Sequence, residues 1–332
     1  MTEEALYFTG QDTVERRPLD LGALAPGEIE IETRVSGISP GTELLVYHGN
    51  VPEGFAVDET IDALGGEFQY PLTYGYASVG DVRAIGEGVD DSWLGRTVFS
   101  FTPHQTATQC RPESVFPLPP DLPTSAGVLL PQIETATNLV LDGNPKLGER
   151  VIVFGAGVVG LNTIRMLGSF PLERLVVVEP RSKPRELARS FGADVVLEPV
   201  EAAEELERMD MDLAYEITGN PSVLDDAIDA VGYDGRIVVA SWYGTKRAAP
   251  DLGGRFHRDR IDIVSSQVST IRPELRGRWD RERRFETAGR WLERIDHERL
   301  ITDRVPFHAA GDAYERLAAT PEDTLQVVLT YE

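Results

Sequence analysis

Val151-Ile152-Val153-Phe154-Gly155-Ala156-Gly157-Val158-Val159-Gly160 is the stretch that decides the fold. Its first four residues form an unbroken apolar run that suits a strand buried on both faces, and after Gly160 the apolar spacing becomes helical. Gly155, Gly157 and Gly160 occupy G-x-G-x-x-G positions. The first glycine permits a tight turn, the second lets a pyrophosphate approach the backbone, and the third lets the helix pack on its strand. Backbone N–H groups from Gly155 through Val158 and Val159 to Gly160 would then face the anion.

A second apolar run, residues 175–178, ends at Glu179, about two dozen residues after Gly155. A carboxylate at that place accepts the ribose 2′-hydroxyl of a dinucleotide and repels a 2′-phosphate, which favours NAD. Arg181 and Lys183 follow closely and would clamp a phosphate if Glu179 turned away, so NADP stays open. Two other readings also stay open: glycines that serve only packing, or a methyltransferase that binds an adenosine through a similar turn.

Strands alternate with helices from residue 125 onward. Six strands are expected at residues 151–154, 175–179, 195–197, 213–217, 237–241 and 261–264. They predict an α/β fold with a doubly wound, parallel Rossmann sheet, whose ligand lies at the carboxyl ends of the strands. Thr218 and Ser241 end two of these strands and are expected to flank the nicotinamide half.

The first third of the chain differs, because short strands and turns follow one another up to Pro120 and predict a β-barrel. A last strand at residues 324–330 is expected to return to this barrel. The expected divisions are a barrel domain at 1–122, a nucleotide-binding domain at 123–266 and a return segment at 267–332. In that segment, Arg272, Arg276 and Arg278 either grip an anionic substrate or balance neighbouring acids.

Composition limits the function classes. The 332 residues include 55 acidic and 32 basic ones, a formal net charge of −23, and lysine occurs only at positions 146, 183 and 246. Nucleic acid is therefore an unsuitable partner, and we expect adaptation to a salty cytoplasm, where charge repulsion is screened. No apolar run is long enough to span a bilayer and no secretory signal begins the sequence, so a cytoplasmic protein without membrane partners is expected. Cys110 is the single cysteine, which excludes an intrachain disulfide.

The order of barrel, glycine-rich unit and short return resembles the medium-chain dehydrogenase/reductase family, whose barrel is GroES-like. The resemblance covers nearly the whole chain. It depends on landmarks in sequence order: Gly37-Ile38 to Gly41-Thr42-Glu43, Gly75 to Gly80-Asp81-Val82, Thr135-Ala136, Gly148-Glu149-Arg150-Val151, Glu216-Ile217-Thr218-Gly219, Gly235-Arg236-Ile237-Val238 and Gln326-Val327-Val328-Leu329. It implies NAD(P)-linked oxidoreductase chemistry on a small molecule and a homo-oligomer, a dimer or tetramer.

Zinc-type members of this family take their catalytic metal ligands from three of these places. Here the corresponding residues are Ser39 or Pro40, Tyr76-Ala77 and Pro131, and none is a usual zinc ligand. No metal site is expected for this reason. Within the family, residues 36–43 followed by residues 70–76 look most like the zinc-lacking branch that includes the bacteriochlorophyllide hydroxyethyl dehydrogenases.

Without a metal, hydrogen-bond donors must polarise the substrate oxygen. The resemblance makes Thr42 a proton-relaying hydroxyl and turns Tyr76, which replaces a zinc ligand, toward the substrate, with Ser39 and His48 nearby. The plainer alternatives are that Thr42 caps a turn, Tyr76 fills volume and His48 lies on a surface loop. We expect Glu43 to be held by a buried arginine.

Three functions remain open on this basis. The first is a zinc-independent NAD(P)-dependent dehydrogenase of a secondary alcohol or its ketone. The second is an NAD(P)H-dependent enone or quinone reductase, and the third is a nucleotide-binding protein without turnover.

Overall fold

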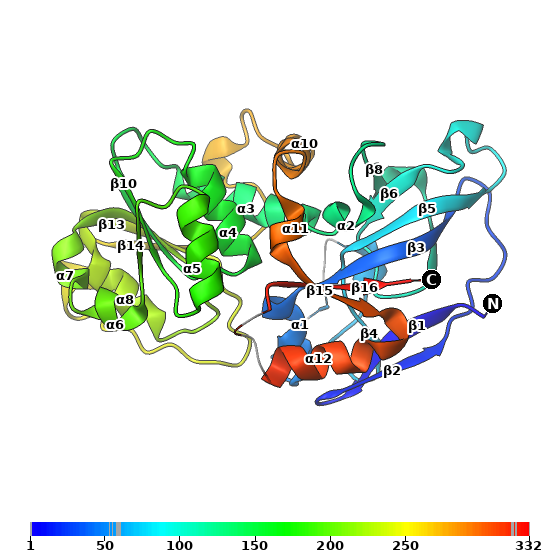
Figure 1. Ribbon diagram of the computed structural model, residues 1–332, viewed down its shortest axis with the longest axis horizontal. Helices are drawn as coiled ribbons and strands as arrows, with labels where there is room; N and C mark the ends of the chain where they lie inside the picture. The colour runs from blue at the N-terminus through cyan, green and yellow to red at the C-terminus, as the bar shows by residue number, and fades with distance from the viewer. Residues whose placement is uncertain are drawn as a thin grey trace. The chain divides into compact units, whose positions relative to one another are not determined.

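The computed structural model describes residues 2–52, 54, 56–57, 61–319, 322 and 324–331 (Figure 1). The chain forms two compact units. The first comprises Met1–Pro131 with Leu292–Glu332, and the second comprises Gln132–Trp291. Residues 267–291, which the sequence analysis placed in the return segment, pack with the second unit. No helix in the described ranges has both the length and the apolar character that crossing a bilayer requires.

The first unit is built mainly of strands. They are β1 (Glu4–Gly10), β2 (Thr13–Pro18), β3 (Ile29–Ile38), β4 (Leu72–Thr73), β5 (Ser78–Ile85), β6 (Thr97–Ser100), β7 (Ala107–Cys110), β8 (Val115–Pro117), β15 (Ile301–Pro306) and β16 (Gln326–Thr330). Its helices are α1 (Pro40–Tyr47), α2 (Thr124–Gly127), α11 (His297–Leu300) and α12 (Ala310–Ala319). The sequence analysis missed α1, although a proline at its first position is a helix-start signal.

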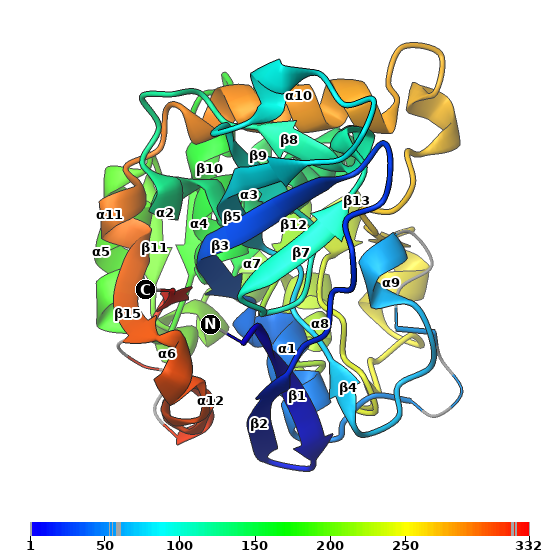
Figure 2. The same cartoon turned by 90° about the vertical axis from the view of Figure 1, so that its right-hand side faces the viewer.

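The strands of the first unit form two sheets. One has the order β15-β16-β3-β5-β6-β8, with β7 also paired to β3, and the other has the order β2-β1-β4. Figure 2 shows β3 between β5 and β7, and β1 beside β2. β16 pairs antiparallel with β3, from Val327 opposite Ile38 to Thr330 opposite Val35. The expected return of the last strand to the first unit is therefore confirmed.

The second unit contains β9 (Arg150–Phe154), β10 (Arg174–Val178), β11 (Val195–Leu197), β12 (Met211–Glu216), β13 (Val231–Val239) and β14 (Asp262–Ser265). These strands are all parallel, in the order β11-β10-β9-β12-β13-β14. The order reverses at β9, as in a doubly wound nucleotide-binding sheet. All six predicted strands are present. β13 begins at Val231 rather than 237. Val231 pairs with Met211 at the start of β12, and the register then shifts before Arg236 pairs with Leu213.

Helices of the second unit are α3 (Leu130–Gly143), α4 (Val158–Leu167), α5 (Ser182–Ser190), α6 (Pro199–Ala203), α7 (Leu206–Met209), α8 (Val223–Ala230), α9 (Arg255–Arg258) and α10 (Arg281–Leu292). Ile152 and Phe154 of β9 join a cluster that includes Ala202 of α6 and Ile228 of α8. Alternate residues of β9, Val151 and Val153, are equally buried. Both faces of the sheet are therefore covered, which explains why its strands read as continuous apolar runs.

Arg284 of α10 explains why residues 267–291 pack with the second unit. Its guanidinium is fully buried and donates to Glu134 Oε1 (2.8 Å from Nη2) and to Asn138 Oδ1 (2.7 Å from Nη1) of α3. It also donates to the main-chain oxygens of Val268 and Thr270. Burial raises the pKa of Glu134, although the Arg284 charge opposes that shift. The Arg284 guanidinium thus joins α3, α10 and the segment between β14 and α10.

Tyr215 of β12 carries a hydroxyl that is buried without a hydrogen-bond partner among the described residues. The hydroxyl occupies the space next to Gly143, where an added Cβ would lie 2.0 Å from it. Burial raises the pKa of Tyr215, so the neutral phenol persists. An unsatisfied buried polar group destabilises the folded state by about 1–3 kcal/mol.

Tyr215→Phe is therefore expected to raise the free energy of unfolding, by about 1 kcal/mol. The corresponding rise in Tm is about 2–4 °C for a unit of this size, measurable by circular dichroism. Tyr243→Phe is the matched control. Its hydroxyl donates to the buried Glu216 at 2.5 Å, and its removal should lower Tm. A lower Tm for Tyr215→Phe would show that its hydroxyl has a partner after all.

Candidate active site and cofactor site

The glycine turn between β9 and α4 has the conformation that its sequence predicts. Gly155 has a φ of +97°, and an added Cβ would lie 2.9 Å from the Ile217 oxygen. At Gly160 an added Cβ would lie 2.2 Å from the Gly155 oxygen, so only glycine lets α4 approach β9 this closely. At Gly157, by contrast, an added Cβ would meet nothing within 4 Å. The fold requires the first and third glycines, whereas the second borders open space.

The first turn of α4 borders the same open space. Gly157 is its N-cap and supplies no side-chain cap, and no acidic residue lies in the first turn, which begins with Val158 and Val159. The first N–H groups of a helix have no partner within the helix, and the positive end of the helix dipole lies there. Such a turn suits the binding of a phosphate.

Glu179 follows β10 and points back toward the glycine turn. Its Oε2 accepts the Ala156 N–H at 2.7 Å, and its Oε1 accepts both the main-chain N–H (3.0 Å) and the Nε–H (2.7 Å) of Arg181. The side chain is almost fully buried, whereas the Arg181 side chain is about one fifth exposed. Arg181 thus covers the carboxylate that the sequence analysis assigned to a ribose.

Thr218 and Ser241 follow the neighbouring strands β12 and β13, as predicted. Ser241 Oγ accepts the Gly219 N–H at 2.8 Å, which joins the two strand ends. Thr218 donates both its N–H (2.7 Å) and its hydroxyl (2.5 Å) to Glu216 Oε1. The sequence analysis gave no role to Glu216, although a carboxylate at the end of a buried strand is an available signal.

Glu216 is fully buried, and Tyr243 donates to its second oxygen. Burial, together with the hydrogen bond and charge of Glu216, raises the pKa of Tyr243. The carboxyl ends of β12 and β13 therefore carry a connected polar cluster formed by Glu216, Thr218, Ser241 and Tyr243. Such a cluster holds the backbone of both loops in place.

In the first unit, the structure brings Thr42 and Tyr76 together. Thr42 lies in the first turn of α1, and Tyr76 lies just before β5. The Tyr76 hydroxyl donates to Thr42 Oγ1 at 3.4 Å, and both side chains are partly exposed. Two hydroxyls from segments far apart in sequence thus form one pair.

Ser39 and His48 lie at opposite ends of α1. Ser39 is the N-cap and is buried, and its N–H donates to Glu43 Oε1 at 2.7 Å. His48 is the C-cap, and its Nδ1 lies 2.5 Å from Asp12 Oδ1 in the turn between β1 and β2. At 1.5 Å per residue, His48 lies roughly 9 Å along the helix from Thr42.

The expectation that a buried arginine holds Glu43 is wrong. Its partners are the Ser39 N–H, His104 Nε2 at 3.0 Å and the Tyr314 hydroxyl. His104 comes from the segment between β6 and β7, and Tyr314 comes from α12. His104 and Tyr314 lie 61 and 271 residues from Glu43 in the sequence, so no short pattern of residues around Glu43 could have predicted them.

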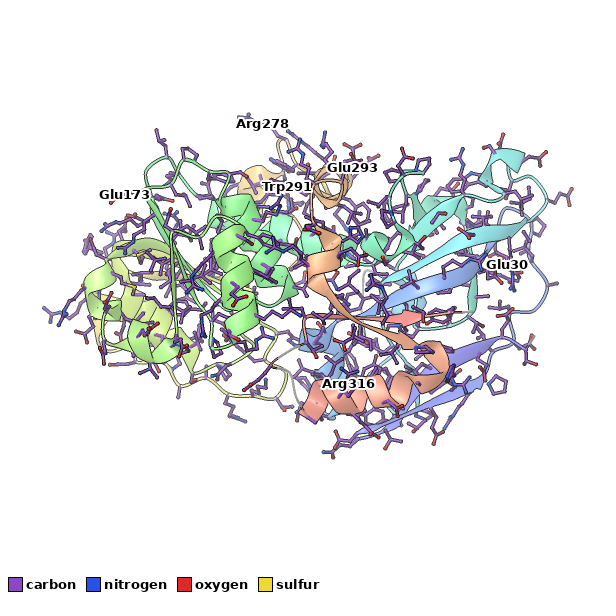
Figure 3. The ribbon with its side chains drawn as sticks, in the orientation of Figure 1. Glu30, Glu173, Arg278, Trp291, Glu293 and Arg316 are labelled. Carbon is purple, nitrogen blue, oxygen red and sulfur yellow. The ribbon has the colours of Figure 1, made fainter. Side chains whose placement is uncertain are left out.

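The arginines of the loop before α10 contact the protein itself. Arg272 Nη1 donates to the main-chain oxygen of Asp142 at 2.7 Å, and Arg276 Nε donates to the main-chain oxygen of Ile271 at 2.9 Å. Arg278 is exposed, and Figure 3 shows it projecting outward from this loop. Arg272 and Arg276 therefore fix the conformation of this loop. Binding of an anionic substrate by any of the three arginines stays a prediction.

Comparison with known proteins shows the family to which the chain belongs. The family model described as the glucose dehydrogenase C-terminus matches residues 136–330. The chain belongs to this family of medium-chain, alcohol dehydrogenase-like proteins. The predicted fold class is thereby confirmed, and membership makes the chain an NAD(P)-dependent oxidoreductase.

Relatives with assigned activities are similar over most of their length. The (R,R)-butanediol dehydrogenase of Bacillus subtilis is 28% identical over 74% of this chain and 77% of its own. The D-guloside 3-dehydrogenase of Escherichia coli is 23% identical over 93% of this chain and 94% of its own. The solved structure of an Escherichia coli alcohol dehydrogenase, rspB, complexed with the cofactor NADH has a TM-score of 0.79, 18% identity, and coverage of 99% and 100%.

Proposed function

We propose that this member of the family is an NAD-dependent dehydrogenase that interconverts a small secondary alcohol and its ketone without zinc. The observation that carries the proposal is the pair of hydroxyls, Tyr76 and Thr42, 3.4 Å apart. One of them stands where zinc-type members have a metal ligand. The proposal assigns substrate chemistry to the first unit and cofactor binding to the second.

The residues of the second unit fit a dinucleotide. Open space at Gly157 and the first turn of α4 suit the pyrophosphate, and Glu179 suits the adenosine ribose. A bound nicotinamide supplies or accepts the hydride. For Glu179 to accept ribose hydroxyls, the Arg181 side chain must give up part of its contact with Glu179 Oε1.

In this proposal, the choice between NAD and NADP depends on the ion pair of Glu179 and Arg181. Glu179→Ser removes the negative charge that repels a 2′-phosphate and frees Arg181 to bind one. We expect the preference for NADH over NADPH to fall at least tenfold, because a hydrogen bond to a charged group contributes about 1.5–3 kcal/mol. Fluorescence titration with both nucleotides at one fixed salt concentration measures this. Adding Arg181→Ala to Glu179→Ser should abolish the gain in NADPH affinity, and an unchanged preference in Glu179→Ser would contradict the assignment.

The donor set supports a reaction without zinc. The positions matching the family's ligands hold Ser39 or Pro40, Tyr76-Ala77 and Pro131, and zinc requires thiolate, imidazole or carboxylate donors. Across the part of the chain that the structure describes, no three or more His, Cys, Asp or Glu residues are grouped to hold a metal. Metal content of the purified protein is the direct check, because stoichiometric zinc would contradict this part of the proposal.

In the proposed reaction, the hydroxyls of Tyr76 and Thr42 take the place of a metal ion as Lewis acid. Tyr76 would donate a hydrogen bond to the substrate oxygen. Thr42 would relay the alcohol proton: its Oγ1 accepts that proton while its own hydroxyl proton passes to solvent water, and the hydride of the carbinol carbon goes to the oxidised nicotinamide. A preorganised donor in such a site contributes about 3 kcal/mol of transition-state stabilisation. In the reverse direction Thr42 would give its hydroxyl proton to the oxygen of the ketone and regain a proton from solvent water.

The relatives support a small polyhydroxylated substrate, because one is named for butanediol and another for a guloside oxidised at position 3. The test is NADH absorbance in the presence of butane-2,3-diol, sugar alcohols, enones or quinones, with and without EDTA. Assays in about 1 M NaCl, where the Debye length is about 3 Å, also test the proposed salt adaptation. Turnover of enones but not alcohols would favour the reductase, and tight NADH binding without any turnover would favour the non-catalytic alternative.

A further inference from the structure

A chain of buried polar groups crosses the interior of the first unit beneath the hydroxyl pair. Glu43 and His104 are both fully buried, and His104 Nε2 lies 3.0 Å from Glu43 Oε2. Tyr314 donates to the same carboxylate oxygen, and the Ser39 N–H donates to the other at 2.7 Å. On the far side of the imidazole, Ser36 Oγ lies 2.7 Å from Nδ1 and 2.9 Å from the Tyr331 hydroxyl.

One arrangement of protons satisfies every group in this chain. Tyr331 donates to Ser36, Ser36 donates to His104 Nδ1, and His104 donates from Nε2 to the Glu43 carboxylate. Burial and the Glu43 charge both raise the pKa of Tyr314, so its phenol keeps the proton that it donates. Each group of the network thus has a hydrogen-bond partner, and the network defines one geometry.

The network joins the two segments that carry Thr42 and Tyr76. Glu43 is next to Thr42 and binds the Ser39 N–H at the start of α1. His104 holds the other segment, because its main-chain N–H donates to the Tyr74 oxygen at 3.2 Å. Its ring also packs against Gly75, where an added Cβ would lie 2.6 Å from the imidazole. The Glu43 to His104 hydrogen bond is therefore a link between the turn before Tyr76 and the helix start that carries Thr42.

We propose that Glu43 and His104 are positioning residues that set the separation of the Thr42 and Tyr76 hydroxyls. This inference rests on the proposed function, in which those hydroxyls act on the substrate oxygen. A buried carboxylate is costly to desolvate and contributes little net stability, whereas a fixed geometry matters greatly to the rate. A displacement of 1 Å at reacting groups can cost up to about 100-fold in rate.

The test compares Glu43→Ala, Glu43→Gln and His104→Ala with the wild-type protein. Glu43→Ala and His104→Ala should lower kcat by about 10-fold or more, with less than threefold change in the KM for the alcohol and in NADH affinity. Glu43→Gln should recover most of kcat. Its amide oxygen still accepts the Ser39 N–H, and its NH2 can donate to His104 once the imidazole proton moves to Nδ1.

A double-mutant cycle separates positioning from general stability. In the Tyr76→Phe background, Glu43→Ala should cost clearly less in kcat than it does in the wild type, because one of the two hydroxyls whose separation it sets is already absent. Ser100→Ala is the matched control. Among the described residues this buried β6 hydroxyl bonds to its near neighbour Thr102 at 2.8 Å, and its loss should leave kcat unchanged. Equal losses from Glu43→Ala with and without the Tyr76 phenol would overturn the inference.

A structural readout tests the inference without relying on turnover. Crystal structures of the wild type and Glu43→Ala should differ in the distance between Thr42 Oγ1 and Tyr76 Oη by about 1 Å or more. An unchanged distance overturns the inference even if the enzyme is active. A changed distance in a protein that turns over none of the substrates supports the positioning and rejects the proposed function.

Discussion

Tyr76→Phe is expected to lower kcat about 100-fold while NADH affinity stays within twofold of the wild type, because one preorganised donor contributes about 3 kcal/mol to the transition state. The aromatic ring remains in Phe, so most of the volume that Tyr76 fills is kept and only the hydroxyl donor is lost. Steady-state kinetics with the best alcohol measure kcat and KM, and NADH fluorescence measures affinity. Loss of kcat with unchanged KM would identify an interaction made mainly in the transition state.

Controls for this prediction come from the same unit. Tyr7 lies on β1, where it pairs with Thr73 of β4, and it is a partly exposed phenol outside the hydroxyl pair. Tyr7→Phe should leave kcat within twofold. Thr42→Val should resemble Tyr76→Phe, and Thr42→Ser should retain most of the activity because it keeps the hydroxyl. A Tyr76→Phe enzyme with near wild-type kcat would show that the phenol only fills space.

Gly160→Ala is expected to destabilise the second unit by about 3 kcal/mol, the upper part of the usual range for overpacking. The added Cβ would lie 2.2 Å from the Gly155 oxygen. That oxygen cannot retreat easily, because the Gly155 N–H is bonded to the Val178 oxygen at 2.9 Å. α4 must therefore move away from β9. Thermal unfolding measures the loss, and NADH affinity should fall with it because the turn is distorted.

Gly157→Ala is the informative companion, because it separates folding from cofactor binding. Its φ is −67°, which any residue adopts, and its Cβ would enter open space. Stability should change by no more than about 0.5 kcal/mol, as for an ordinary surface substitution. NADH affinity should nevertheless fall about 10-fold or more, because the methyl group occupies the approach of the pyrophosphate. Normal affinity in Gly157→Ala would place the dinucleotide elsewhere.

The sequence alone determined the parts of this protein that depend on neighbours along the chain. The glycine turn, the six parallel strands, and the positions of Glu179, Thr218 and Ser241 at strand ends all follow from short patterns of apolar and turn residues. Such patterns are local, since a buried parallel strand must be apolar throughout and a turn with positive φ needs glycine. α1 was missed because Gly41 and the β-branched Val46 are poor helix formers, and burial of Leu45 and Val46 stabilises the helix instead.

Only the tertiary structure decided which polar groups meet. Glu43 is 61 residues from His104 and 271 from Tyr314, and the Thr42 and Tyr76 hydroxyls come from segments 34 residues apart. The sequence placed Glu179 at the right strand end but did not show that it faces Ala156 and is covered by Arg181. A hydrogen bond in a buried site depends on directions and distances to within a fraction of an ångström. The packing of whole elements sets these, and no local pattern of residue types records them.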